Sequence, residues 1–325
     1  MRKTPVAVLA GALMTTGLLG LGGPADARQA GTRAEGSPVV AHKTDAAGSA
    51  AAQKQVREYW TKARMRSATP KTVTPTGTAT KVESGKPSAV KGKPTPQPTD
   101  GYLGGPWTGG GNVVKTTGKV FFTEGGANYV CSGSAVTSAN QSTVTTAGHC
   151  VNEGPGAFVT NFAFVPAYDH GSRPYGTFAA TRLFTTSQWQ TSGDFDYDVG
   201  MAKVAPVGGK TLQATVGSQG IAFNQPRGQF LYSFGYPQAA PYDGTTLDYC
   251  SGTVRNDTYG GSNDLRLACN MTGGSSGGPW FQGFNGSTGT QVSVNSFGYR
   301  GEKNAMYGPY FGTVIQSLYN TAQSS

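Results

Sequence analysis

Histidine, the side chain most often used as a general base near neutral pH, is scarce in this chain of 325 residues. The first, His42, lies in a basic N-terminal stretch, so an imidazole mechanism in the rest of the chain must use His149 or His170. His149 follows a strand-like run, 142–144, and precedes Cys150, where a disulfide could hold the ring rigidly at a strand end. His170 lies in a polar, turn-like stretch. For either histidine, a surface or structural role is the alternative.

A glycine-rich run, Gly-Gly-Ser-Ser-Gly-Gly-Pro over 273–279, surrounds Ser276. A nucleophilic serine needs an adjacent base and donors aimed at the oxygen where negative charge builds. Glycines at 274, 277 and 278 let the backbone turn sharply, so that neighbouring amides can point at one spot. Such a run alone is more often a flexible turn. The apolar residues on both sides favour a loop anchored in a core: Met271, Trp280 and Phe281.

The same run also matches the Gly-x-Ser-x-Gly elbow of α/β hydrolases at 274–278. That fold requires the order serine, acid, histidine. No histidine follows His170, and the alternating helices of a doubly wound sheet are missing. The elbow interpretation is therefore rejected.

All four cysteines, at 131, 150, 250 and 269, lie in the C-terminal 225 residues, and an even number in an exported chain favours two disulfides. Three pairings are possible. We predict Cys131 with Cys150 and Cys250 with Cys269, because each bond closes a short loop of similar length. A zinc site is disfavoured, because no close Cys-x-x-Cys or Cys/His cluster has metal-ligand spacing. We expect neither a metal nor a cofactor.

The N-terminus has the features of an export signal. Arg2 and Lys3 precede an apolar run, 6–21, which is followed by Pro-Ala-Asp-Ala at 24–27, a small-x-small cleavage site. The run is interrupted by glycines and is shorter than the roughly 18 residues that a spanning helix needs. We therefore predict a signal peptide over 1–27, a secreted extracellular protein, and no membrane attachment after cleavage.

The formal net charge of +9 is unevenly distributed. Residues 1–27 contribute +1 and residues 28–100 contribute +8, whereas residues 101–325 hold 11 basic and 11 acidic side chains. A neutral C-terminal region has no general attraction for phosphates, so nucleic acid is excluded as its partner.

Residues 28–100 are predicted to be a pro-segment with a Thr/Pro-rich linker. Apolar residues fall at helical spacing between 51 and 66, which predicts one short amphipathic helix: Val56, Tyr59, Trp60 and Ala63. From 67 to 100 the composition is too poor in apolar residues to offset the entropy of ordering.

From Gly101 onward the sequence predicts a mainly β domain, 101–325. Short runs rich in Val, Thr, Phe and Tyr, such as 119–123, 228–233 and 291–294, are separated by turn residues. Helical periodicity returns at 311–321, where we expect a closing helix. A region of this length suits one sandwich or a pair of small barrels.

Three motifs together resemble those of the chymotrypsin/trypsin-like serine peptidases: Thr-Ala-Gly-His-Cys at 146–150, Asp-Val-Gly-Met at 198–201, and Gly-Ser-Ser-Gly-Gly-Pro at 274–279. Their order, His, Asp, Ser, also matches. The resemblance covers about residues 112–321 and implies an all-β fold of two six-stranded antiparallel β-barrels with a C-terminal helix.

By this resemblance Ser276 is the nucleophile, His149 the general base and then acid, and Asp198 the carboxylate that orients the imidazole. The amides of Gly274 and Ser276 would form the oxyanion hole. Asp194 and Asp196 compete for the acid role, but Asp198 directly precedes an apolar run, as the family's acid does.

The resemblance also assigns the surroundings of the site. The Cys131–Cys150 pair resembles the family's bridge beside the histidine. Ser296, Phe297 and Gly298 resemble the edge to which substrate backbone adds as a strand, and 308–310 a wall of the specificity pocket. Asn270, Met271 and Gly298 are candidates to line that pocket, and no charged residue is evident there.

One departure from the family pattern is informative. Ser275 stands before the nucleophile, where the animal enzymes use an aspartate to bind the new N-terminal ammonium, so that ion pair cannot form here. The chain therefore resembles bacterial secreted, actinobacterial-type members, including the glutamyl endopeptidases, more closely. Those usually have a histidine where this chain has Asn295, so a preference for glutamate is unsupported.

We therefore expect a secreted, monomeric serine endopeptidase that acts on polypeptides and is made as a precursor cut near Asp100. Two other classes of function are possible. A trypsin-like fold can persist as a catalytically silent binding module. A carbohydrate-binding protein could use some of the 15 tyrosines and 15 phenylalanines as sugar platforms, although aromatic residues are more often part of a core.

Overall fold

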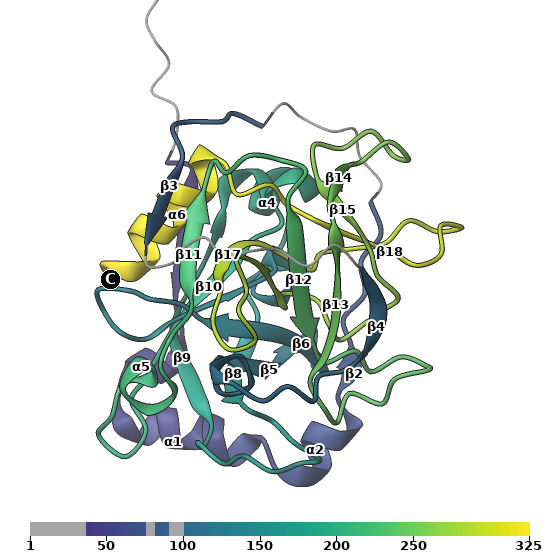
Figure 1. Ribbon diagram of the computed structural model, residues 1–325. Helices are drawn as coiled ribbons and strands as arrows, with labels where there is room; N and C mark the ends of the chain where they lie inside the picture. The colour runs from purple at the N-terminus through teal and green to yellow at the C-terminus, as the bar shows by residue number, and fades with distance from the viewer. Residues whose placement is uncertain (1–36, 76–81, 91–100) are drawn as a thin grey trace, which may run out of the picture. The chain divides into compact units, whose positions relative to one another are not determined.

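The structure of the protein is a computed structural model that describes residues 37–75, 82–90 and 101–325 (Figure 1). The signal peptide predicted over 1–27 lies outside these residues. Within the described part the protein is mostly β, with short helices and a longer one at the C-terminus. This confirms the predicted fold class.

Six strands close into the first barrel, in the order β9-β10-β7-β6-β5-β8, with β8 pairing back onto β9. They are β5 (Thr117–Glu124), β6 (Ala127–Ala135), β7 (Thr143–Thr146), β8 (Thr160–Pro166), β9 (Phe178–Thr186) and β10 (Gly200–Val204). The β5–β6 hairpin turns through Gly125 and Gly126, both at positive φ, as a two-residue primed turn requires. Alternate side chains such as Val120 and Phe122 fill the barrel interior.

The second half divides its strands between two sheets. One sheet has the order β3-β11-β17-β16-β12-β13-β4 and the other β14-β15-β18. The strands are β3 (Ser88–Val90), β4 (Tyr102–Pro106), β11 (Gly220–Phe223), β12 (Phe230–Gly235), β13 (Asp248–Thr253), β14 (Arg255–Asn256), β15 (Leu265–Ala268), β16 (Pro279–Gln282), β17 (Thr290–Val294) and β18 (Ala305–Gly308). A disulfide, Cys250–Cys269, joins β13 to the end of β15. The family resemblance implied a second six-stranded barrel here, whereas the described strands of this half form these two sheets.

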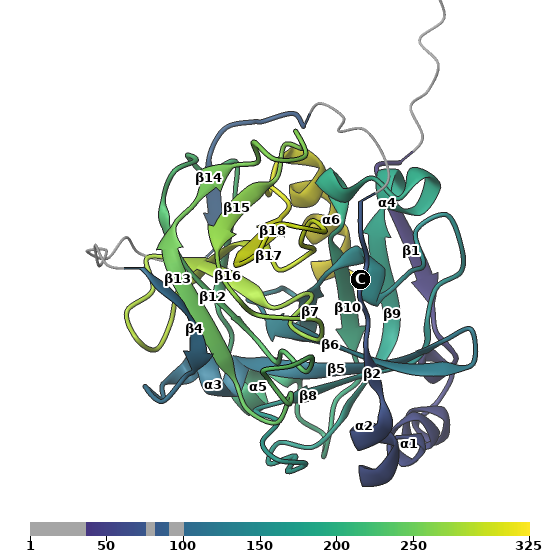
Figure 2. The ribbon, with the colours of Figure 1, turned by 90° about the vertical axis from the view of Figure 1, so that its right-hand side faces the viewer.

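The C-terminal helix α6 (Thr313–Gln323) holds the two halves together. It was expected over 311–321. Its apolar face packs in one cluster with Met201 of the first barrel and Val294 of the second half. The Tyr319 hydroxyl also donates to the Thr137 carbonyl at 2.6 Å. Figure 2 shows α6 beside β10, on the side of β17 and β18. The other helices of the C-terminal region are short: α3 (Asn112–Thr116), α4 (Ser187–Ser192) and α5 (Leu212–Val216).

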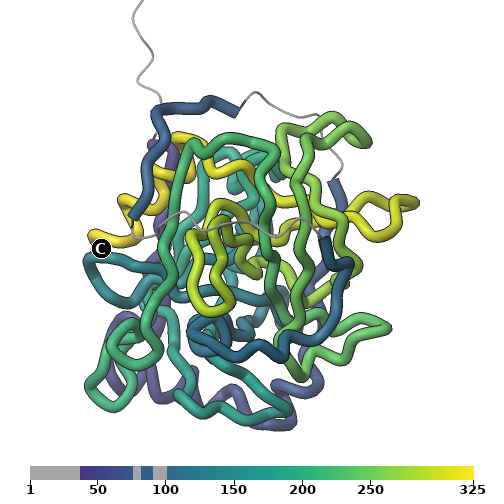
Figure 3. The backbone as a smooth tube through the Cα atoms, viewed as in Figure 1, coloured from purple at the N-terminus to yellow at the C-terminus, as the bar shows by residue number. Residues whose placement is uncertain are grey.

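Residues 37–75 pack on the first barrel. Strand β1 (Val39–Lys43) pairs antiparallel with β9, and β2 (Thr69–Pro70) pairs in parallel with β6. Two helices lie between them, α1 (Ala50–Tyr59) and α2 (Lys62–Ser67), where one helix was predicted. The break falls at Trp60, which leaves helical geometry at ψ 72° and is fully buried. Figure 3 traces the backbone of these residues in purple and blue.

Candidate active site

The ends of neighbouring strands bring the three residues of the predicted triad into one region. His149 lies in a 3-10 turn, Gly148–Cys150, directly after β7, and Asp198 directly precedes Val199 and β10. Because β10 pairs with β7 with Gly200 opposite Thr146, both side chains emerge at the same end of this strand pair. Ser276 belongs to the loop between β15 and β16.

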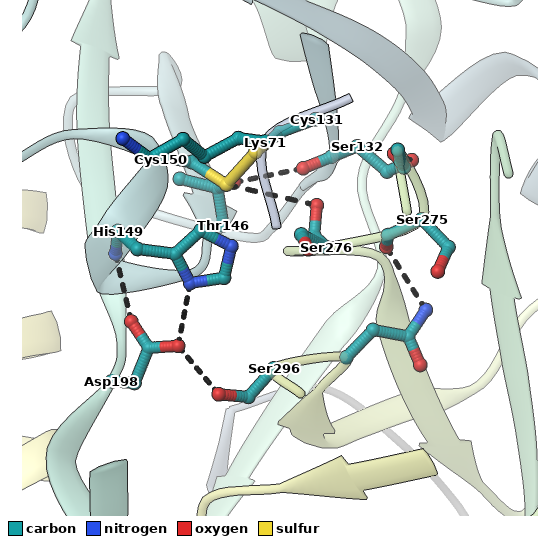
Figure 4. Close-up of a disulfide and its surroundings, with 12 residues drawn as sticks. Lys71, Cys131, Ser132, Thr146, His149, Cys150, Asp198, Ser275, Ser276 and Ser296 are labelled. Carbon is teal, nitrogen blue, oxygen red and sulfur yellow. Dashed lines mark hydrogen bonds and ion pairs between the residues drawn. A yellow bond between two sulfur atoms is a disulfide. The ribbon is translucent and has the colours of Figure 1, made fainter. Parts of the chain in front are cut away.

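Asp198 binds His149 at two points. Its Oδ1 accepts from the backbone N–H of His149 and its Oδ2 lies 2.7 Å from Nδ1 of the ring (Figure 4). The Ser296 hydroxyl donates to the same Oδ2 at 2.5 Å. Both Asp198 and His149 are buried. Three donors therefore satisfy this carboxylate away from water, and together they fix the orientation of the ring.

The other two candidate acids lie close by in different surroundings. The carboxylate of Asp196 accepts from the backbone and side-chain amides of Asn263 at 2.7 and 2.9 Å. Asp194 accepts from the backbone N–H of Asp196. Asp198 is therefore the carboxylate that contacts the imidazole in this structure.

The remaining ring nitrogen of His149, Nε2, is buried and has no hydrogen-bond partner among the described residues. Figure 4 shows it on the side of the ring that faces Ser276. With Nδ1–H donating to Asp198, Nε2 carries the lone pair of a neutral imidazole. The ring can therefore accept a proton on this side.

The loop that carries Ser276 requires its glycines. Gly274 has φ +100° and Gly277 has φ +80°. A Cβ at Gly277 would lie 2.0 Å from Oγ1 of Thr146, which is too close for any side chain. The carbonyl of Ser276 also accepts from the Ser132 N–H at 2.7 Å, so the loop is fixed against β6. The run is therefore an anchored turn and not a flexible one.

Two backbone amides at Ser276 have no hydrogen-bond partner among the described residues. Neither the Gly274 nor the Ser276 N–H has an acceptor within the part of the chain that the structure describes. The Gly273 carbonyl accepts from the Gln238 N–H at 2.7 Å. Since C=O and N–H of a trans peptide point in opposite directions, the Gly274 N–H points away from Gln238. Both amides can therefore bind a negatively charged oxygen.

A cavity of 250 Å³ adjoins Ser276, and we call it the Ser276 cavity. Its lining comes from four stretches of the chain: 72–74, 271–276 without Gly274, 296–298, and 305–306. No lining residue is charged. Met271, Ser296, Phe297 and Gly298 line it as the sequence indicated, but Asn270 does not. Its side-chain oxygen instead accepts from the Tyr242 hydroxyl at 2.5 Å.

The sequence did not indicate two groups of lining residues. Ala305 and Met306 lie on β18, which carries no motif, and Thr72–Thr74 belong to the segment predicted to be a linker. Ser132 was also missed: its hydroxyl donates to the Gly274 carbonyl at 2.9 Å and accepts from the Tyr236 N–H. Only contacts between distant parts of the chain identify these residues.

Both nearest-neighbour disulfides are present, Cys131–Cys150 and Cys250–Cys269. Cys131, His149 and Cys150 form the one group of potential metal ligands close enough to share an ion among the described residues. The two sulfurs are bonded to each other and cannot act as thiolate ligands. The other histidine, His170, is exposed and pairs with Asp169.

Asp264 is a fully buried aspartate near Asp198. Neither of its oxygens has a hydrogen-bond partner among the described residues. Burial, and then the nearby carboxylates of Asp196 and Asp198, raise the pKa of Asp264 well above its usual range. No motif in the sequence indicated this residue.

No helix within the described ranges is long and apolar enough to cross a membrane.

Residues 131–287 match the model of the trypsin-like peptidase domain. The solved structure of the protease Anisep from Arthrobacter nicotinovorans is 55% identical, covers 65% of this chain and 97% of its own, and has a TM-score of 0.63. The thermostable serine protease AL20 from an extremophilic microorganism is 49% identical, with a TM-score of 0.63. The match covers 66% of this chain and 99% of that protein. A Glu endopeptidase shares the fold at 19% identity, with a TM-score of 0.52. The match covers 65% of this chain and 92% of that protein.

A curated relative, named extracellular metalloprotease, comes from Bacillus subtilis (strain 168) and is 34% identical over 86 residues. The match spans 26% of this chain and 26% of that protein, about a quarter of its length. Among the described residues, the one group of potential metal ligands contains two cysteines that a disulfide joins, so this group does not fit the metal in that relative's name.

Proposed function

The chain belongs to the family of trypsin-like serine proteases, and from this premise we propose that it is an endopeptidase whose triad is Ser276, His149 and Asp198. The arrangement of His149 carries the proposal. Asp198 binds both its backbone N–H and its Nδ1, while Nε2 is left without a partner on the side of Ser276. A ring held in this way is a positioned general base.

In the proposed reaction, the Ser276 hydroxyl oxygen bonds to the carbonyl carbon of the substrate while its proton passes to Nε2 of His149. The carbonyl oxygen becomes negatively charged and accepts from the N–H groups of Gly274 and Ser276. The C–N bond then breaks as the imidazolium returns the proton to the leaving amine. A water molecule repeats the sequence on the acyl-enzyme and regenerates Ser276. Asp198 stays ionised and stabilises the imidazolium.

The substrate is a polypeptide, and we infer that the side chain before the scissile bond is uncharged. The Ser276 cavity offers thioether, aromatic and methyl surface from Met271, Phe297, Ala305 and Met306, and no charge to pair with an ion. Cleavage-site profiling with a peptide library tests this. A preference for cleavage after Asp, Glu, Lys or Arg would contradict it.

We further propose that the protein is exported as a precursor and acts as a monomer. The signal-like residues 1–27 and a relative named extracellular support export. The basic residues 28–100 would be removed by a cut near Asp100. Sequencing the N-terminus of the protein recovered from culture medium tests both cuts, and size-exclusion chromatography tests the monomer.

Substitution of the nucleophile tests the function directly. Ser276→Ala should lower kcat by roughly 10⁶-fold and abolish labelling by a fluorophosphonate, because it removes the hydroxyl of the proposed nucleophile. Ser324→Ala, at an exposed position near the C-terminus, is the control and should leave both unchanged. Undiminished hydrolysis in Ser276→Ala would overturn the assignment. An unreactive native protein would favour the silent binding module instead.

A further inference from the structure

We propose that the pro-segment predicted over residues 28–100, which we call the leader, is a built-in inhibitor. Its residues 69–74, which we call the blocking segment, lie across the catalytic site and keep polypeptide out of it. The inference rests on the proposed function. It concerns what the leader does before it is removed, and the contacts that support it come from three places along the leader.

The first contacts fix the leader upstream of the blocking segment. The fully buried Trp60 packs against Phe121 of β5, and its indole N–H donates to the Asn161 carbonyl at 2.6 Å. Met65 and Ala68 are buried in the same core cluster. A buried tryptophan contributes strongly to a docked interface, so this anchor holds the following residues in place.

The second contacts place the blocking segment beside the catalytic residues. Pro70 lies opposite Val130 on β6, and the Lys71 N–H donates to the Val130 carbonyl at 3.2 Å. Val130 directly precedes Cys131, which is bonded to the neighbour of His149. The Lys71 ammonium pairs with Glu124, and Figure 4 shows Lys71 on the disulfide side of the site.

Thr72, Val73 and Thr74 then form one wall of the Ser276 cavity. Thr72 lies against the nucleophile loop, because a Cβ on Gly273 would come within 2.6 Å of its methyl group. The nucleophile, Ser276, is only 7% exposed in this arrangement. These three residues line the same cavity as Ser296–Gly298, so a polypeptide that added as a strand to that edge would compete with them for the space beside Ser276.

The third contacts fix the leader downstream, on the second half of the molecule. The Gly85 N–H donates to the Asn224 side chain at 2.9 Å, and β3 adds to the edge strand β11 with Val90 opposite Ile221. The leader is therefore attached to the first barrel before the site and to the second half after it. Because it is part of the same chain, its effective concentration at the site is millimolar or more.

The experiment measures how fast a fluorophosphonate labels the precursor, residues 28–325. Labelling is measured only on the species with the precursor's mass, so that processed enzyme does not contribute to the rate. We expect the native precursor to be labelled at least tenfold more slowly than the processed enzyme. Trp60→Ala, which removes the anchor, should raise the labelling rate of the precursor at least tenfold. Lys54→Ala, on the exposed face of α1, is the matched control and should leave it slow.

A peptide of residues 50–75 added to the processed enzyme gives an independent readout that does not depend on how the variants fold. We expect competitive inhibition of hydrolysis, weakened at least tenfold by the same Trp60→Ala change in the peptide. Equal labelling of precursor and processed enzyme, or no inhibition by the peptide, would overturn the inhibitor but leave the proposed function intact. A processed enzyme that is not labelled at all would overturn the proposed function itself.

Discussion

The carboxylate that the first barrel supplies to the catalytic site and the backbone amides that the second half supplies are in opposite states. The first barrel supplies His149 and Asp198, and every oxygen of that carboxylate has a donor. The second half supplies the Ser276 loop, in which the amides of Gly274 and Ser276 have no acceptor among the described residues. Buried polar groups are normally paired, so the exceptions need a reason. Groups that hold the geometry bind to the protein, and groups that meet the substrate are kept free for it.

Asp264 limits this rule. It too is buried in the second half without a partner among the described residues, yet it does not line the Ser276 cavity. A free polar group therefore indicates a reactive site only when it opens onto a space that substrate can enter.

The largest effect is expected from Asp198, the carboxylate whose oxygens all have donors. Asp198→Asn should lower kcat by about 10⁴-fold with little change in KM, because an amide can no longer hold the Nδ1–H tautomer of His149. Steady-state kinetics on a peptide substrate measures it. Asp196→Asn is the matched control, since Asp196 binds Asn263, and should lower kcat far less. Equal losses in the two variants would show that Asp198 has no special role.

The two disulfides allow the two halves to be compared directly, because each bond joins cysteines 19 positions apart. Replacing either pair with alanines should lower the free energy of unfolding by about 3 kcal/mol, since loops of equal length constrain the unfolded chain equally. Only loss of Cys131–Cys150, which adjoins His149, should also lower kcat of the folded protein. Denaturant unfolding in the Ser276→Ala background and kcat in the active protein measure the two effects. Equal kcat in both variants would contradict the expected asymmetry.

The smallest effect concerns Asp264 and depends on pH. The pKa of Asp264 is raised in the native state. At a pH above the usual pKa range of a carboxyl group, the native protein therefore still holds a proton on Asp264 that the unfolded chain has lost. Stability from this group is therefore present at low pH and falls as pH rises toward the native pKa. Asp264→Asn, whose side chain does not titrate, should therefore gain in free energy of unfolding relative to the parent as the pH rises above the usual range of a carboxyl. Thermal unfolding in the Ser276→Ala background measures it, and parallel pH profiles would refute the explanation.

Several features were predictable because each depends on residues close together in the chain. The glycines of 273–279 predicted a sharp turn, and the Gly274 and Gly277 φ values require one. The run 119–123 lies within β5, and the closing helix expected at 311–321 forms at Thr313–Gln323. The strand expected at 228–233 begins two residues later, at Phe230, shortly after a bend at Arg227 and Gly228.

The leader was harder to interpret. The spacing of Val56, Tyr59 and Trp60 correctly indicated a helix with an apolar face. Helical spacing alone did not indicate the break at Trp60, because the break is stabilised by contacts with Phe121 of β5 and Asn161 of β8, about 60 to 100 positions away. Likewise the composition of 67–100 indicated a linker, whereas β2 and β3 pair with strands of the two halves.

By itself, the sequence determined the chemistry that is available: one well-placed histidine, a serine among glycines, three aspartates in one stretch, and cysteines spaced for two bonds. Only the tertiary structure decided that Asp198 contacts His149, that Asn270 turns toward Tyr242, and that Thr72–Thr74 wall the Ser276 cavity. The physical reason is that turns and helices depend on near neighbours. Strand register and docking instead depend on hydrogen bonds and packing between residues far apart in the chain.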